Sequence, residues 1–195
     1  MDSRNWWVLP WWVLASAGGY AVGGLIEAAA GPLTGVAVIG YVTAGGTVAA
    51  TLQWPALRWH VSGAGRWVAG AIVAGAVVGV TSIALGVVAG LGAGAVGDAD
   101  AGRAFGADVA GVSAAVLYGA AVGVMQWRLL RRRFTRAGRW VLASAAGWIV
   151  AGLTAGIAEG IAGWAVLGAV YGAITGLVLV LLLRRRESET PAAER

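Results

Sequence analysis

The chain has 195 residues, of which 59% are hydrophobic and only 12% are charged, and its mean hydropathy is +0.78. A soluble domain carries about 25% charged residues, so this chain lacks the polar surface that covers a water-soluble globule, and it is too hydrophobic for a disordered protein. It contains no cysteine, which excludes disulfides, thiolate metal sites and thiol nucleophiles. The composition predicts a protein embedded in a lipid bilayer.

Six apolar stretches are long enough for a transmembrane helix, which needs about 20 residues to cross about 30 Å of hydrocarbon. In chain order they lie near Trp11–Ala30, Leu33–Gln53, Trp67–Leu91, Val109–Trp127, Trp140–Ala158 and Gly163–Leu183. The first stretch could be a signal peptide, but tryptophans crowd its start and its sequence recurs later, so we interpret it as a retained span. We expect an all-α integral membrane protein forming one domain over 1–195, with 187–195 as a disordered tail.

The arginines predict the orientation, because positively charged residues collect in cytoplasmic loops. The net charge is +5, every basic residue is an arginine, and only Arg103 falls among the connections predicted on the outer side. Both termini are therefore expected in the cytoplasm, with the protein in a bacterial-type inner membrane. Nine of the eleven tryptophans fall at the same predicted ends, where their rings would anchor the helices at the headgroup level. Trp148 and Trp164 are the two exceptions.

An internal repeat predicts the packing of the spans. A shift of 128 residues aligns 12–47 with 140–175 without a gap, and 17 of the 36 aligned positions are identical. A fainter middle copy gives three two-helix repeats at about 11–60, 66–133 and 139–186, the middle one with an outer-loop insertion at about 92–108. Parallel repeats are related by an axis along the membrane normal. We expect a pseudo-threefold six-helix bundle, although an open row of hairpins would show the same repeat.

Glycines spaced four residues apart predict where the helices touch, because membrane helices associate through close packing at small residues. The pairs are Gly19/Gly23, Gly75/Gly79 and Gly119/Gly123, and the longer ladders are Gly86/Gly90/Gly94, Gly152/Gly156/Gly160 and Gly168/Gly172/Gly176. We interpret them as seams inside the chain, one of which could also serve a protein partner or a second copy.

Four polar residues in or beside the predicted spans are candidates for a solute pathway. Glu27 and Glu159 are the carboxylates nearest the hydrocarbon, where an ionisable group often marks an ion or proton path. The alternative is that both are hydrated at the outer interface. Gln53 and Gln126 occupy equivalent repeat positions, each followed by a tryptophan. They could bond across helices, hold a headgroup phosphate, or simply end a helix beside an anchoring tryptophan.

The cytoplasmic arginines are candidates for binding anionic lipid headgroups, although topology alone already accounts for most of them. The candidate residues are Arg131, Arg132, Arg133, Arg184, Arg185 and Arg186. Nucleic-acid binding is not expected, because the positive charge is juxtamembrane rather than spread over a soluble domain. His60 is the only histidine, so neither a histidine metal cluster nor paired-histidine haem ligation is expected. We expect no cofactor and no enzyme activity.

Two motifs recur at the ends of the hairpins. They open with Trp-x-x-Ala-Ser-Ala-x-Gly, as at Trp12, and close with Gly-x-x-x-Gly-x-x-Gln-Trp-x-x-Leu-Arg, as at Gly119–Arg131. With these motifs the chain resembles small Gly- and Trp-rich bacterial multi-pass membrane proteins with tandem two-helix repeats. That resemblance covers nearly the whole chain and implies the architecture but no activity. Mitochondrial carriers also use three two-helix repeats, but their Pro-x-Asp-x-x-Arg signature is absent.

These observations favour a non-catalytic structural or accessory subunit, a scaffold of a larger membrane assembly. The alternative is a small channel or transporter along the pseudo-threefold axis, with Glu27 and Glu159 at its outer mouth and the 92–108 loop as a lid. The weakness of the alternative is the scarcity of polar residues at mid-depth, where threonines are the main candidates.

Overall fold

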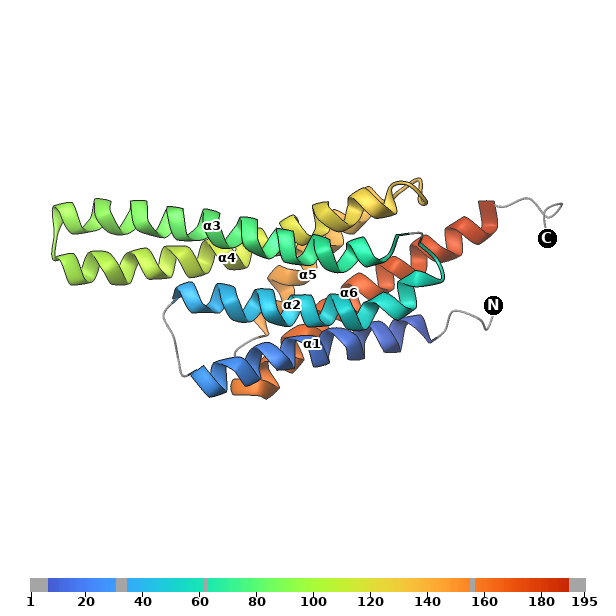
Figure 1. The fold of residues 1–195 in the computed structure, drawn as a ribbon, viewed down its shortest axis with the longest axis horizontal. Coiled ribbons are helices and arrows are strands. Elements are labelled where there is room, and N and C mark those ends of the chain that lie inside the picture. The colour runs from blue at the N-terminus through green and yellow to red at the C-terminus, as the bar shows by residue number, and fades with distance from the viewer. Residues whose placement is uncertain (1–6, 31–34, 62, 155–156, 190–195) are drawn as a thin grey trace.

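The computed structural model describes residues 7–30, 35–61, 63–154 and 157–189, and all regular structure in them is α-helical (Figure 1). The six helices are α1 (Val8–Ala30), α2 (Gly35–Arg58), α3 (Gly65–Val96), α4 (Ala99–Leu130), α5 (Gly138–Leu153) and α6 (Gly160–Glu189). Four of them, α1, α3, α4 and α6, are long and apolar enough to cross a membrane. The fold is therefore all-α with several candidate membrane spans.

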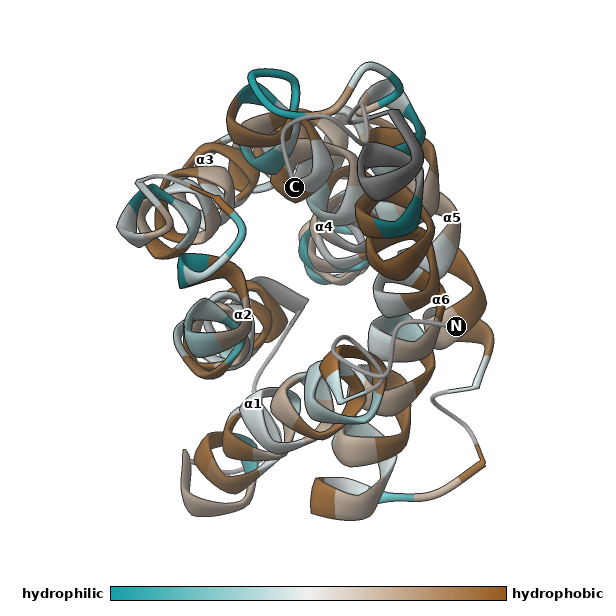
Figure 2. Cartoon of the chain, turned by 90° about the vertical axis from the view of Figure 1, so that its right-hand side faces the viewer, coloured by the Kyte–Doolittle hydropathy of each residue, from teal (hydrophilic) through white to brown (hydrophobic). Residues whose placement is uncertain are grey.

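The six helices enclose a common centre. Helices adjacent in the chain pack against each other, and α6 also packs against α1. Figure 2, which looks along the bundle, shows them arranged around the centre with α1 beside α6. Contact between the first and last helices answers one question that the sequence leaves open, because an open row of hairpins would keep them apart.

The middle hairpin differs from expectation. Residues 92–108, predicted as an outer loop, instead continue α3 and α4, and only a tight turn at Gly97 and Asp98 separates the two helices. At about 1.5 Å per residue, the 32 residues of each helix span about 48 Å. The 23 residues of α1 span about 35 Å. The α3–α4 hairpin therefore projects beyond its neighbours, on the left of Figure 1.

The high glycine content that predicts a loop instead allows α3 and α4 to pack closely along their extended ends. A Cβ added at Gly86 would lie 2.5 Å from the carbonyl oxygen of Gly106, and one at Gly102 would lie 2.7 Å from the Cα of Gly94. The helix backbones thus approach more closely than side chains permit. Glycine costs about 1 kcal/mol relative to alanine in a helix, and close backbone packing offsets that cost here.

The predicted end of the fifth span is wrong, and so is the packing role predicted for one glycine ladder. The apolar run predicts a helix as far as Ala158, but α5 ends at Leu153 after 16 residues, about 24 Å. Gly160 begins α6 at a φ of +57°. A Cβ added at Gly152 would meet no atom within 4 Å, so the Gly152/Gly156/Gly160 series is not a packing seam. Gly156 itself lies outside the described residues. Because α5 ends at Leu153 and α6 begins at Gly160, no single helix carries both Gly152 and Gly160.

The core lies along the centre of the bundle and the outer surface is apolar. Buried side chains form two clusters, one around Trp12 and one around Tyr20. Outward-facing residues such as Leu14, Val80 and Leu142 are 68–71% exposed. Soluble monomers rarely expose extended apolar surfaces, whereas a lipid-facing surface is expected to be apolar.

Candidate functional site

Three tryptophans from three helices meet at the centre of the bundle. Trp12 of α1, Trp67 of α3 and Trp140 of α5 are each 1% exposed. Their ring centroids lie 5.3–5.9 Å apart in edge-to-face pairs. Each such pair contributes about 0.5–1.5 kcal/mol beyond burial. The expectation that these three tryptophans anchor the protein at the membrane surface is wrong, because they face one another in the core.

Each indole of this tryptophan triad donates a hydrogen bond to the helix that precedes it around the bundle. The three bonds are Trp67 Nε1 to Gln53 Oε1 (3.0 Å), Trp140 Nε1 to Gln126 Oε1 (3.0 Å) and Trp12 Nε1 to Thr175 Oγ1 (3.1 Å). Gln53 also donates from Nε2 to Ser16 Oγ at 2.9 Å. The structure therefore brings both predicted glutamines into interhelical bonds, with side chains that are only 3–4% exposed.

A second aromatic layer lies next to the triad. Its members come from α1, α4, α5 and α6, and they are Tyr20, Tyr118, Trp148 and Tyr171. Neighbouring rings lie 5.0–6.2 Å apart. The cavity between the two layers is about 10 Å³, room for roughly one water molecule. Aromatic side chains thus fill the described axis of the bundle.

The structure separates the two candidate carboxylates. Glu27, half-buried near the end of α1, accepts a 2.6 Å hydrogen bond from Trp164 Nε1 of α6. Glu159 is exposed just before α6 begins. The hydrogen bond from Trp164 to Glu27 therefore joins α6 to α1. Trp164 is one of the two tryptophans that fall away from the predicted cytoplasmic ends.

The arginines predicted to bind lipid headgroups lie in different surroundings. Arg131 stacks its guanidinium on the ring of Trp127, with 4.9 Å from Cζ to the ring centroid. Arg132 and Arg133 line a pocket together with Arg66, which no sequence motif singles out. Arg184 is exposed, and the side chains of Arg185 and Arg186 lie outside the described residues.

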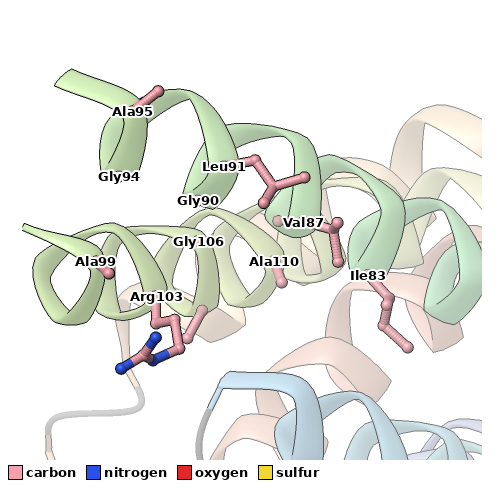
Figure 3. Close-up of a pocket in the computed structure, with 12 residues that line it drawn as sticks. Ile83, Val87, Gly90, Leu91, Gly94, Ala95, Ala99, Arg103, Gly106 and Ala110 are labelled. Carbon is pink, nitrogen blue, oxygen red and sulfur yellow. The ribbon is translucent and has the colours of Figure 1, made fainter.

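The projecting part of the α3–α4 hairpin carries an apolar groove of about 620 Å³. Figure 3 shows Ile83, Val87 and Leu91 of α3 pointing to this side, with Arg103 of α4 at its edge. Leu91 is 71% exposed and Val88, on the neighbouring surface, is 70% exposed. Two packed helices therefore stand where a loop was expected to act as a lid.

Sequence reasoning misses the triad when each tryptophan is considered alone. The repeat does align Trp12 with Trp140 at a shift of 128 and Trp67 with Trp140 at a shift of 73. If the three repeats surround one axis, equivalent side chains that point toward the axis lie next to one another. That signal is present in the sequence, but it depends on the ring being closed.

Among the described residues, no three His, Cys, Asp or Glu side chains lie close enough together to hold a metal ion. Comparison with known proteins finds no matching family model, no similar curated protein and no similar solved structure. The function is therefore argued from the chain's own geometry.

Proposed function

We propose that this protein is a non-catalytic integral membrane protein that serves as an accessory subunit or scaffold of a larger membrane assembly. In this proposal all six helices lie in a bacterial-type inner membrane, with both termini in the cytoplasm. The apolar outer surface supports insertion. The arginines on the connections at the end where α1 begins and α6 ends support the orientation. The short α5 would be accommodated by local thinning or tilt of its neighbours.

Three hairpins around a pseudo-threefold axis are part of the proposal. The tryptophan triad supports this arrangement, because each hairpin contributes one tryptophan from the start of its first helix. The three indole bonds run in the same sense, from α1 to α6, from α3 to α2 and from α5 to α4. Such a cycle is what three equivalent units around one axis produce.

The projecting half of the α3–α4 hairpin carries the functional proposal. It extends about 10 residues per helix beyond the length of a single membrane span, yet it keeps Val88, Leu91 and Phe105 exposed at 52–71%. Neither water nor headgroups favour such a surface. Its groove runs along two helices, so we assign it to an apolar helix of a neighbouring membrane-protein subunit, packed as small-residue interfaces pack.

Site-specific photo-cross-linking in native membranes tests this assignment. A photoreactive residue replaces Leu91 or Val87, which both line the groove, and Leu142 on α5, as exposed as Leu91 at 71%, is the matched control. We expect one integral membrane protein to be captured at both groove positions and not at Leu142. Its co-purification is expected to be lost in a Val87→Asp variant. Equal capture at Leu142, or adducts of two copies of this chain alone, contradicts the proposal.

The channel or transporter is less well supported. The axis in the described residues is filled by the tryptophan triad and the second aromatic layer, and the cavity of about 10 Å³ between them does not form a path. Liposome flux measurements test this alternative directly. Flux above that of empty liposomes, reduced by Glu27→Gln, would favour transport over the scaffold.

A further inference from the structure

Arg66, in the first turn of α3, and Arg132 and Arg133, in the connection between α4 and α5, line one pocket at the end of the bundle where α1 begins and α6 ends. The pocket has a volume of about 200 Å³ and is lined by Gly63, Arg66, Leu129, Arg132 and Arg133. A water molecule in the liquid occupies about 30 Å³, so the pocket has room for a small polyatomic group.

The arginine backbones are held in place by hydrogen bonds of the two connections. Arg66 N–H donates to the carbonyl of Gly63 at 3.0 Å. Arg132 N–H and Arg133 N–H donate to the carbonyls of Leu129 and Leu130, at 3.4 and 2.9 Å. The backbone positions of the three arginines are therefore fixed by two separate turns of the chain.

Two of the pocket arginines have no acidic partner among the described residues. Arg103 pairs with Asp100 in the projecting α3–α4 hairpin near its turn, far from this pocket. Other arginines at the same end of the bundle have aromatic partners: Arg58 lies 4.8 Å from the ring centroid of Trp59, and Arg131 stacks on Trp127. Arg66 and Arg132 make neither kind of contact in the described part of the chain.

The start of α3 makes the pocket more positive. Arg66 lies in the first turn of this 32-residue helix, which has no acidic residue in its first turn and no side-chain cap at Ala64. The amino end of a helix carries a partial positive charge and favours anions. A cation there is mildly unfavourable, and a bound anion would offset both positive charges.

We propose that the pocket of Arg66, Arg132 and Arg133 binds a single phosphate group. Guanidinium groups match phosphate oxygens with paired, charge-assisted hydrogen bonds, and the amino end of α3 adds backbone dipoles. The phosphate belongs either to an anionic lipid headgroup or to a soluble phosphate compound. The lipid source rests on the proposed membrane insertion, whereas binding of soluble phosphate does not.

Binding is measured on the full-length protein with two probes. Inorganic phosphate is titrated against protein in neutral detergent by calorimetry, and phosphatidylglycerol is compared with phosphatidylcholine in nanodiscs by native mass spectrometry. The test variant is Arg66→Gln/Arg132→Gln. The matched control is Arg128→Gln/Arg136→Gln, which removes the same charge from exposed arginines that do not line the pocket. An Arg66→Lys/Arg132→Lys variant keeps the charge and removes the fork geometry.

We expect the test variant to bind at least about tenfold more weakly than the wild type with one or both probes, since two charge-assisted contacts are lost. The control is expected to stay within about twofold, and the lysine variant to fall between them. Loss with phosphatidylglycerol alone assigns the site to lipid, and loss with inorganic phosphate assigns it to a soluble phosphate compound. Absence of binding to wild type with both probes, or equal loss in test and control variants, overturns the proposal. Circular dichroism of each variant verifies folding, and none of these outcomes depends on whether a partner subunit exists.

Discussion

The third hairpin contains a natural replacement for the buried glutamine, and it gives a quantitative test of the triad. In α6, Leu179 stands where Gln126 stands in α4, and the acceptor for the indole is Thr175, one turn earlier. The residue one turn before Gln126 is Val122, which is 5% exposed. Val122→Thr with Gln126→Leu therefore copies the α6 arrangement into α4.

Gln126→Leu alone leaves the indole N–H of Trp140 without its acceptor in the core. Bonds between membrane helices average about 0.6 kcal/mol, and leaving a buried donor unpaired costs about 1–3 kcal/mol. We expect the single variant to lose about 1 kcal/mol of unfolding free energy, roughly a fivefold shift in the folded-to-unfolded ratio. In the double variant, the threonine hydroxyl can accept from the indole while donating to the carbonyl one turn back, as Thr175 does to Tyr171 at 2.8 Å. We expect it to recover at least half of the loss.

Equilibrium unfolding in mixed micelles of a mild detergent and SDS, followed by circular dichroism, measures these free energies. Gln53→Leu is the internal comparison, because it removes two bonds, to Trp67 and to Ser16, and should cost about twice as much. Val122→Thr alone is the control for the added hydroxyl. A neutral Gln126→Leu variant, or a double variant no more stable than the single one, would refute the assignment of stability to the indole bonds.

Three further variants test the packing and the carboxylates. Gly86→Ala places a Cβ 2.5 Å from the carbonyl oxygen of Gly106 and should lower the unfolding free energy by about 1–3 kcal/mol. Gly92→Ala is the control, because its Cβ meets no atom within 4 Å and alanine favours the helix. An equal loss of stability in both variants would show that contact between the helices is not the cause. Glu27→Ala removes the hydrogen-bond acceptor of Trp164 and should lower the unfolding free energy by about 1 kcal/mol in the same assay. Glu159→Ala should change it by no more than about 0.5 kcal/mol. A larger loss for Glu159→Ala than for Glu27→Ala would contradict the contact between α1 and α6. Arg103→Gln breaks an exposed ion pair with Asp100 and should change the unfolding free energy by less than about 1 kcal/mol. A larger loss would show that this ion pair stabilises the end of the α3–α4 hairpin more than an exposed pair normally does.

Hydrophobic patterns predict the helices well where helix formation depends on the local sequence alone. The apolar stretches at Trp11–Ala30 and Gly163–Leu183 each fall almost entirely within one helix, α1 and α6. The pattern fails at 92–108, because glycine lowers helix propensity in isolation yet permits the backbone contact between Gly86 and Gly106 that stabilises the extension. It fails again at α5, where the chain leaves the helix after Leu153 although the apolar run continues.

The candidate site is only partly accessible to sequence reasoning. Gln53 and Gln126 are recognisable as equivalent polar positions, but their acceptor role depends on indoles 14 residues away on the next helix. Arg66 is visible only as a topogenic charge until the fold places it beside Arg132 and Arg133. Both features join residues from different helices, and no periodicity within one helix encodes such a meeting.

The sequence by itself determined the helical, bilayer-compatible character of the protein, because hydrophobicity, glycine spacing and charge are additive properties of local segments. It also contained the duplication that makes Trp12 and Trp140 equivalent. Only the tertiary structure decided that α6 packs against α1, that the tryptophans of the triad point into the core rather than outward, and that the middle hairpin projects as a pair of helices. These outcomes depend on close packing and hydrogen-bond geometry between segments far apart in the chain, which composition and periodicity do not specify.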